Sequence, residues 1–178
     1  MFFRSRNLFL RPLWPEDADG LQALMGPAMF ERTNAWLNAS DLHAASVAEH
    51  PRLPRCLVTL PDRSGEHIVG VAALLARADG VYLEVWIGQD YRGRGFGREV
   101  TRAMAEMARA IGHSGLKARV DGACTAAQRA LAGAGFRVFA EGERPHQGSV
   151  QIAPVDVCLY EMALISHGKG VYQPSFAA

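Results

Sequence analysis

The longest regular pattern of apolar positions in this chain lies between residues 96 and 111. Apolar residues recur there at steps of three and four, the spacing of one helix face: Phe96, Val100, Ala103, Met104, Met107, Ala108 and Ile111. Charged residues take the opposite side at similar steps: Glu99, Arg102, Glu106 and Arg109. We therefore predict an amphipathic helix that begins near Arg98, in which the methionines fill the core and do not contact a cofactor.

Shorter patterns before this helix predict a first half built around hairpins. Residues 55–60, 68–76 and 81–87 are apolar, strand-like runs, joined by a turn at residues 61–65 and by the hairpin signal Asp79-Gly80. Residues 8–13 alternate weakly as a first strand. Glu16 and Asp17 then place negative charge where a helix begins, and Gly26-Pro27 ends that helix after about Met25. Residues 40–50 are predicted to form a further helix.

The second half alternates strands with a helix. Residues 116–120 and 136–140 are predicted strands on either side of a helix at 125–134, and residues 150–164 alternate as a closing strand. The polar segment 141–148 is predicted to be a surface loop and a candidate substrate lip, and residues 166–178 a loosely held tail. This order predicts an α/β fold with one mixed sheet flanked by helices, in a single domain over residues 1–165.

Composition narrows the class of protein. The 178 residues are 49% hydrophobic and 21% charged with a net charge of +1, which allows one core and does not favour nucleic-acid or membrane partners. Cys56, Cys124 and Cys158 lack metal or disulfide spacing and favour a reducing, cytoplasmic compartment. We expect no secretion signal, because charge interrupts residues 1–6, and no membrane span, because the longest apolar run, 68–76, is too short.

The candidate chemistry lies between the strand at 81–87 and the long helix, in the segment Arg92-Gly93-Arg94-Gly95-Phe96-Gly97. Glycines tolerate positive φ and let backbone N–H groups converge on one anion, and the helix behind them adds unpaired N–H groups and the positive end of its dipole. Arg92, Arg94 and Arg98 add charge suited to phosphate oxygens. We interpret residues 92–97, the glycine loop, as a binding site for the phosphates of a small ligand.

Two well-known phosphate loops do not fit this segment. A nucleotide-triphosphatase loop ends in Gly-Lys followed by Ser or Thr, whereas Gly97 is followed by Arg98 and Glu99. A dinucleotide loop has glycines at its first, third and sixth positions, whereas these fall at the first, third and fifth. A glycine-rich turn with solvated arginines remains the alternative interpretation.

The glycine loop resembles the acyl-CoA pyrophosphate loop of the GNAT superfamily of N-acetyltransferases, whose pattern is Arg or Gln, two residues, Gly, one residue, then Gly or Ala. Arg92, Gly95 and Gly97 match it. The opening Asn7-Leu8-Phe9-Leu10-Arg11-Pro12-Leu13, with Glu16-Asp17-Ala18, looks like the start of the branch that acetylates ribosomal-protein N-termini. Leu131-Ala132-Gly133-Ala134-Gly135-Phe136 is similar to the family's late helix end. The resemblance covers about residues 8–164 and implies a mostly antiparallel sheet.

The resemblance also implies where acetyl-CoA binds. In the family, the strand before the loop and the strand after the long helix diverge, and the pantetheine arm inserts between them. Backbone groups of Val85 and Ile87 would pair with that arm, and the amides from Val85 to Ile87 would face the thioester oxygen. The implied cofactor-binding residues are Val85, Trp86, Ile87, Arg92, Gly93, Arg94, Gly95, Phe96, Gly97, Arg98 and Cys124.

Glu84 is the candidate catalytic base. An amine that is protonated at neutral pH must lose its proton before it attacks a thioester. Glu84 is the only carboxylate in residues 81–87, and strand alternation puts it on one face with Tyr82 and Trp86. We interpret it as the base, acting directly or through water. An ion pair with an arginine explains a lone glutamate equally well.

Two departures from the family pattern bear on catalysis. Many members have a tyrosine acid four residues before the glycine of Gly-Phe, where this chain has Leu131, and often an asparagine near the position of Cys124. The thiolate then leaves unaided, or Tyr82, Tyr160 or Cys124 replaces the acid, or the protein is catalytically weak. Cys124 is not favoured as a nucleophile, because no histidine adjoins it in sequence.

Two functions therefore stay open. The first is an N-acetyltransferase acting by direct attack on a small-molecule amine or a protein N-terminus, a function compatible with a homodimer. The second is an inactive acyl-CoA-binding sensor or regulatory module, and a nucleotide-binding protein is a weaker alternative. The histidines lack metal-site spacing, and only His146, in the 141–148 loop, merits a test. Trp36 lies in the region that often shapes the family's acceptor pocket.

Overall fold

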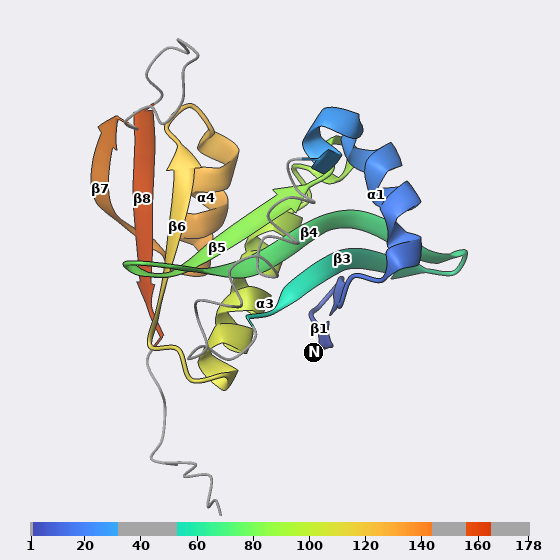
Figure 1. Cartoon of the computed structure of the whole chain (residues 1–178), viewed down its shortest axis with the longest axis horizontal. Helices are drawn as coiled ribbons and strands as arrows, with labels where there is room; N and C mark the ends of the chain where they lie inside the picture. Colours follow the sequence, from blue (N-terminus) through green and yellow to red (C-terminus); the bar gives the residue numbers. More distant parts are fainter. Residues whose placement is uncertain (1, 32–52, 144–155, 165–178) are drawn as a thin grey trace, which may run out of the picture.

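Residues 2–31, 53–143 and 156–164 are described by the computed structural model (Figure 1). They form an eight-stranded sheet in the spatial order β1-β2-β3-β4-β5-β6-β8-β7. All neighbouring strands are antiparallel except β5 and β6, which run parallel. The strands are β1 (Phe3–Arg4), β2 (Phe9–Arg11), β3 (Arg55–Asp62), β4 (Gly65–Arg77), β5 (Gly80–Ile87), β6 (Gly115–Asp121), β7 (Arg137–Glu143) and β8 (Asp156–Ala163). The predicted mixed, mostly antiparallel sheet is confirmed.

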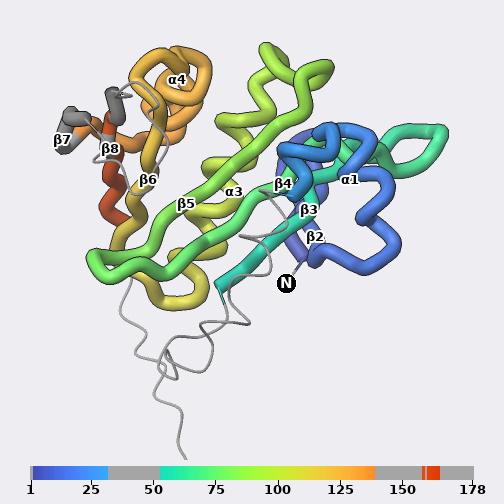
Figure 2. Tube along the Cα trace, turned by 45° about the horizontal axis from the view of Figure 1, so that its top comes forward, coloured from blue at the N-terminus to red at the C-terminus, as the bar shows by residue number. Residues whose placement is uncertain are grey.

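Helices cover both faces of this sheet (Figures 1 and 2). A short 3-10 helix, η1 (Pro15–Asp17), leads into α1 (Ala18–Met25), which packs on one face, where Leu21 joins Leu57 and Val71 in a small buried cluster. On the other face, α3 (Phe96–Ala110) and α4 (Thr125–Ala134) cover the main core. A second 3-10 helix, η2 (Gln89–Tyr91), leads from β5 toward the glycine loop.

The predicted apolar stripe of α3 forms much of the main core. Its buried members are Phe96, Val100, Ala103, Met104, Met107 and Ala108. Met104 and Met107 are at most 1% exposed, so their predicted role as core residues is confirmed. The helix begins at Phe96, earlier than predicted, because the left-handed Gly95 is already its N-cap.

Several strands are longer than predicted. The turn between β3 and β4 is reduced to Arg63 and Ser64, because Pro61 and Asp62 pair with β4. A proline fits there because β2 begins opposite Thr59, so that among the described residues no strand pairs with the outer edge of β3 beyond it. The first residues of the predicted loop 141–148 belong to β7, since residues 141–143 pair with β8.

Some predictions fall on parts of the chain that are not described. The predicted helix at 40–50, Trp36, His146 and the tail at 166–178 all lie outside the described residues. Within the ranges that are described, no helix is long and apolar enough to cross a membrane.

A buried ion pair joins the short strand β2 to the helical segment that follows it. Nη1 and Nη2 of Arg11 donate to the two carboxylate oxygens of Asp17 at 2.7 and 2.8 Å, and each residue is 6% exposed. Nε of Arg11 also donates to Glu66 at 3.2 Å, and Asp17 accepts the backbone N–H of Trp14 at 2.8 Å. This pair gives a physical reason for an arginine in the strand and an acid at the helix start.

Glu99 ties the N-terminal segment to the start of α3. Its Oε1 accepts hydrogen bonds from Ser5 Oγ at 2.7 Å and from the backbone N–H of Asn7 at 2.6 Å, and its Oε2 accepts one from Asn7 Nδ2 at 2.9 Å. Burial raises the pKa of Glu99, but these hydrogen bonds outweigh burial and hold that pKa below its usual range. The start of α3 is therefore anchored to the edge of the sheet that β1 and β2 form.

Replacing Asp17 by asparagine should lower the free energy of unfolding by about 3 kcal/mol, because Arg11 would stay buried with only Glu66 as a carboxylate partner. Chemical denaturation followed by circular dichroism measures this loss. Asp19→Asn, at an exposed position of α1, is the matched control and should change stability by less than about 0.5 kcal/mol. Equal losses in the two variants would contradict the role of the pair.

Acid titration gives a second readout of the same pair. The hydrogen bonds from Arg11 lower the pKa of Asp17. Because the folded pKa lies below the unfolded one, the stabilisation is complete above the unfolded value, near pH 4, and is lost as pH falls through the folded value. Stability should therefore fall more steeply with acid in the wild type than in Asp17→Asn.

Candidate active site

The sheet opens between β5 and β6. These strands pair only at Tyr82 with Lys117 and at Leu83 with Ala118. Beyond these pairs they diverge, since β5 stays with β4 and β6 stays with β8 (Figure 1). Residues 84–87 and 119–121 therefore border a gap, which we call the β5–β6 opening. The strand divergence implied by the family resemblance is present.

Backbone hydrogen bonding decides which groups of β5 point into the β5–β6 opening. The N–H of Gly88 donates to the carbonyl of Val69 at 2.9 Å, so these residues form a hydrogen-bonded pair beside the β4–β5 ladder. Such pairs alternate along an antiparallel ladder, so the backbone groups of Trp86 also point toward β4. Those of Val85 and Ile87 point the other way, into the opening.

The glycine loop follows β5 and η2 and ends in the first turn of α3. Gly93 and Gly95 have φ values of +75° and +83°, a left-handed conformation that is costly for other residues. The hydrogen bond from Glu99 N to Gly95 O, 3.1 Å long, opens the helix. The N–H groups of Phe96, Gly97 and Arg98 therefore have no acceptor within the helix and form its positive end.

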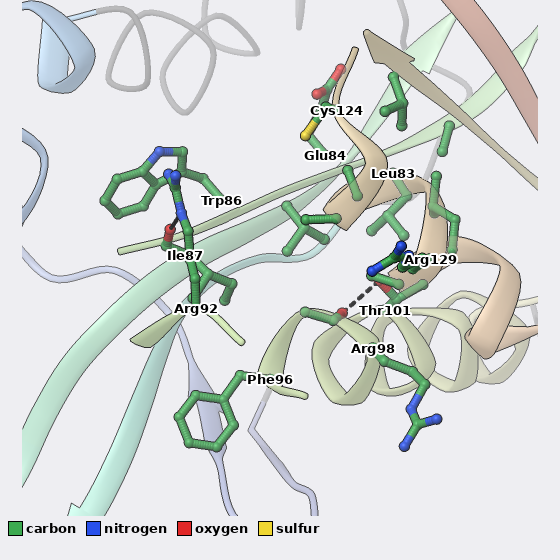
Figure 3. A pocket seen from close by; sticks show the side chains of 18 of the residues that line it. Leu83, Glu84, Trp86, Ile87, Arg92, Phe96, Arg98, Thr101, Cys124 and Arg129 are labelled. Carbon is green, nitrogen blue, oxygen red and sulfur yellow. Dashed lines mark hydrogen bonds between the residues drawn. The ribbon is translucent and has the colours of Figure 1, made fainter. Parts of the chain in front are cut away.

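A cavity of about 700 Å³ occupies the β5–β6 opening and reaches the glycine loop (Figure 3). Its walls come from β5, β6, the glycine loop, the start of α3 and one face of α4. They are formed by residues 83–87, 91–93, 95–98, 101, 118–121, 124, 126, 127 and 129–131. This volume lies within the range of roughly 300–1,000 Å³ that is usual for ligand sites.

All but one of the predicted cofactor residues line this cavity. Val85, Trp86, Ile87, Arg92, Gly93, Gly95, Phe96, Gly97, Arg98 and Cys124 are in its walls. Arg94 is not among the wall residues, because its guanidinium lies over the ring of Tyr91 with Cζ 5.6 Å from the centroid. The structure thus brings together residues that the sequence spreads over two strands, a loop and a helix end.

Of the two other arginines near the loop, Arg92 is hydrogen-bonded to the protein and Arg98 packs against α4. Nε of Arg92 donates to the carbonyl of Ile87 at 3.0 Å (Figure 3). The side chain of Arg98 lies over Gly133 of α4, where an added Cβ would come 2.7 Å from its Cδ, and in Figure 3 it points away from Arg92. An anion bound at this loop would therefore be held more by open backbone N–H groups than by the predicted arginine forks.

Glu84 lies beside the β5–β6 opening, on the face of the sheet that α1 covers. Strand alternation puts Trp86 on the same face, where its ring packs with the cluster of Leu21 and its neighbours. Glu84 lines the cavity, and its Oε1 accepts a hydrogen bond from Nη2 of Arg77 at 3.1 Å. Both features that the sequence allowed are therefore present, the position beside the gap and the ion pair with an arginine.

Of the three side chains considered as replacement acids, only Cys124, the exposed N-cap of α4, lines the cavity. Tyr82 is 1% exposed and donates its hydroxyl to Asp79 at 2.7 Å, near the β4–β5 turn. Burial, together with Asp79, raises the pKa of Tyr82. Tyr160 is buried in the main core. Leu131, at the family's usual acid position, is buried in the cavity wall.

Sequence reasoning missed the walls that β6 and α4 supply. Arg119 and Asp121 come from β6, and Arg129 comes from α4 together with three alanines. The alanine-rich composition of residues 125–134 was an available signal, because small side chains let two helices approach closely. A Cβ added at Gly97 would lie only 3.5 Å from Cβ of Ala130.

Comparison with protein families identifies the fold and its class of chemistry. Residues 7–137 match the model of the acetyltransferase (GNAT) domain. The chain belongs to the GNAT acetyltransferase family. This match spans most of the chain, so the family named from the glycine loop is confirmed. Comparison with curated protein sequences gives no match.

Solved structures share this GNAT fold at low sequence identity. A ribosomal-protein-S5-alanine acetyltransferase from Vibrio fischeri is 16% identical, with a TM-score of 0.64 over 92% of this chain and 96% of that one. A proposed acetyltransferase from Salmonella typhimurium, solved with its cofactor acetyl-CoA, is 17% identical, with a TM-score of 0.63 over 97% and 100%. A spermidine N-acetyltransferase chimera from Vibrio cholerae and hSSAT is 15% identical, with a TM-score of 0.65 over 89% and 96%.

Replacing Gly95 by valine should weaken CoA binding by roughly tenfold, because about 1–2 kcal/mol of left-handed strain is relieved only by moving the loop. Isothermal titration calorimetry with CoA measures the change. Gly112→Val is the matched control, since Gly112 also has a positive φ (+94°) and no atom within 4 Å of an added Cβ, but lies past the far end of α3. Equal CoA affinity in the two variants would contradict the assignment of the loop.

Proposed function

We propose that this GNAT protein is an N-acetyltransferase that moves the acetyl group of acetyl-CoA to a primary amine by direct attack in a ternary complex. The observation that carries this proposal is one continuous cavity that joins the glycine loop to Glu84 through the β5–β6 opening. A thioester carrier with a diphosphate at one end and the reactive carbon at the other requires such a connection.

The cofactor would be held mainly by backbone groups. The open N–H groups of residues 96–98, at the positive end of α3, suit a diphosphate. The backbone groups of Val85 and Ile87 point into the gap and offer an extended partner for the pantetheine amides, although Arg92 already occupies the carbonyl of Ile87. We therefore assign the first hydrogen bonds of the arm to Val85 and the N–H of Ile87.

Transfer of the acetyl group then needs a proton acceptor and support for negative charge. The neutral amine nitrogen forms a bond to the thioester carbon, the carbonyl electrons move to oxygen, and a backbone N–H of Val85 or Ile87, the two that point into the opening, stabilises that oxygen. We assign the amine proton to Glu84, directly or through water. When the C–S bond breaks, the thiolate takes a proton from solvent or from Cys124, the replacement acid that lines the cavity.

We propose that the chain lies close to the branch that acetylates ribosomal-protein N-termini. The Arg11–Asp17 pair supports this, because it gives the strand and helix start of that branch a structural role in this chain. The acceptor would be a small amine or a protein N-terminus. We also propose a reducing, cytoplasmic setting, because Cys56, Cys124 and Cys158 are free thiols. Burial raises the pKa of Cys56 to about 11, which makes it unreactive.

The alternative is an acyl-CoA-binding module with little or no catalysis. It is favoured by one observation, the buried Leu131 in the cavity wall at the position of the family's usual acid. Without an acid, thiolate departure is slower, but binding of the cofactor is unaffected.

Incubation with acetyl-CoA and a panel of primary amines should yield N-acetylated products together with free CoA. Product mass spectrometry with a quantified amine measures the turnover. Saturable CoA binding without acetylated product for any amine in the panel would instead support the binding module. A Gly95→Val control should lose product in proportion to its loss of CoA affinity.

Replacing Glu84 by glutamine should lower kcat by about tenfold or more, because the amide cannot accept the amine proton. CoA affinity should stay nearly unchanged, since Glu84 points to the face opposite α3. Steady-state kinetics together with calorimetry separate the two effects. Glu106→Gln, on the exposed side of α3, is the matched control and should keep full activity. Unchanged turnover of Glu84→Gln across pH would remove Glu84 from the mechanism.

A further inference from the structure

We propose that Arg119 selects an acceptor amine that also carries an anionic group, such as a carboxylate. This inference rests on the proposed acetyl transfer and adds the chemical class of the acceptor. Arg119 comes from β6, a strand that the sequence did not predict to line the cavity.

Arg119 stands opposite the candidate base across the gap in the sheet. The last pair that joins β5 to β6 is Leu83 with Ala118, so Glu84 and Arg119 are the first residues beyond it on their strands. Lys117 pairs with Tyr82, so the side chain of Arg119, two residues on, shares the sheet face of Tyr82 and Glu84. Both Glu84 and Arg119 line the cavity.

Two ion pairs lie beside Arg119 on this face. Arg77 forms an ion pair with Glu84 at 3.1 Å, and Lys117 forms one with Asp79 at 3.0 Å. Asp121, the next β6 residue on the face, accepts the backbone N–H of Ala123 at 2.8 Å. Arg119 is exposed and enters none of the ion pairs found within the described ranges. Its positive charge is therefore available to a ligand at the opening.

The guanidinium of Arg119 packs on the ring of Tyr82. Cζ of Arg119 lies 5.8 Å from the centroid of the Tyr82 ring, and Cζ of Arg77 lies 4.9 Å from it. The ring itself is buried, and its hydroxyl is held by Asp79. A guanidinium that rests on a buried ring loses less freedom when it binds a carboxylate than a free one does.

The sheet separates this charge from the cofactor phosphates. The glycine loop and α3 lie on the opposite face, to which the Ala118 and Val120 side chains point by strand alternation. An anion at Arg119 would therefore belong to the acceptor that enters from the Glu84 side. The acceptor's ammonium would face Glu84 while its anionic group faces Arg119. A polyamine would place its second cation against Arg77 and Arg119, which disfavours it.

Matched amines test this assignment with acetyl-CoA at saturation. The probes are leucine against leucinamide, a tetrapeptide with Glu at position two against its Gln counterpart, and a linear diamine. For the wild type, kcat/KM should be roughly tenfold or more higher for the acidic member of one pair than for its neutral partner, and lowest for the diamine. A preference within the leucine pair would indicate a free amino acid as the acceptor, and a preference within the peptide pair would indicate a protein N-terminus with an acidic second residue.

Variants assign the preference to Arg119. In Arg119→Gln, the ratio of kcat/KM within the preferred pair should fall close to one, while the KM for acetyl-CoA stays unchanged. Arg119→Lys should retain part of the preference for the acidic acceptor. Arg109→Gln, on the exposed side of α3, should leave the ratio unaltered. Equal rates for acid and neutral partners in the wild type, or an effect of Arg119→Gln confined to the KM for acetyl-CoA, would overturn this inference alone. Absence of product with every amine would overturn the proposed transfer as well.

Discussion

The shortness of the parallel β5–β6 ladder is the constraint on which the rest of the site depends. Two residue pairs join these strands, whereas β5 is paired with β4 along its whole length and β6 with β8 along its own. Each half of the sheet is therefore held by its own antiparallel neighbour. Leu24 of α1 packs closely at Gly88 and keeps the end of β5 on the β4 side. The result is a strand edge with free backbone groups inside a folded core.

Strand alternation at this gap separates two kinds of chemistry. Leu83, Val85 and Ile87 face α3 and the glycine loop, where a cofactor would bind. Glu84 and Trp86 face α1, and Arg119 joins them from β6. The two faces communicate only where the strands part, so an acceptor and a thioester can meet there from opposite sides. This arrangement supports the proposed direct attack.

In the glycine loop the backbone conformation matches the prediction, whereas the contacts of the arginines do not. The positive φ values of Gly93 and Gly95 and the open helix N-terminus are what the pattern predicts. The arginines, by contrast, contact other parts of the protein. Arg92 donates to a backbone carbonyl, Arg94 lies over an aromatic ring, and the side chain of Arg98 packs at a glycine of α4. An anion at this loop would therefore depend more on backbone N–H groups than on the arginines, and Arg92 binds the carbonyl at the end of β5.

The sequence by itself determined the long helix, the β4–β5 hairpin and the glycine loop, because helical periodicity, hairpin turns and left-handed glycines are local properties. It also placed Glu84 on the correct strand face, since alternation needs only a strand. The tertiary structure alone decided that Arg94 leaves the cavity, that Arg77 pairs with Glu84, and that Arg119 faces Glu84. The first two are local contacts that depend on side-chain conformations no pattern encodes, whereas the third depends on the register of β5 with β6, which are joined through the whole of α3.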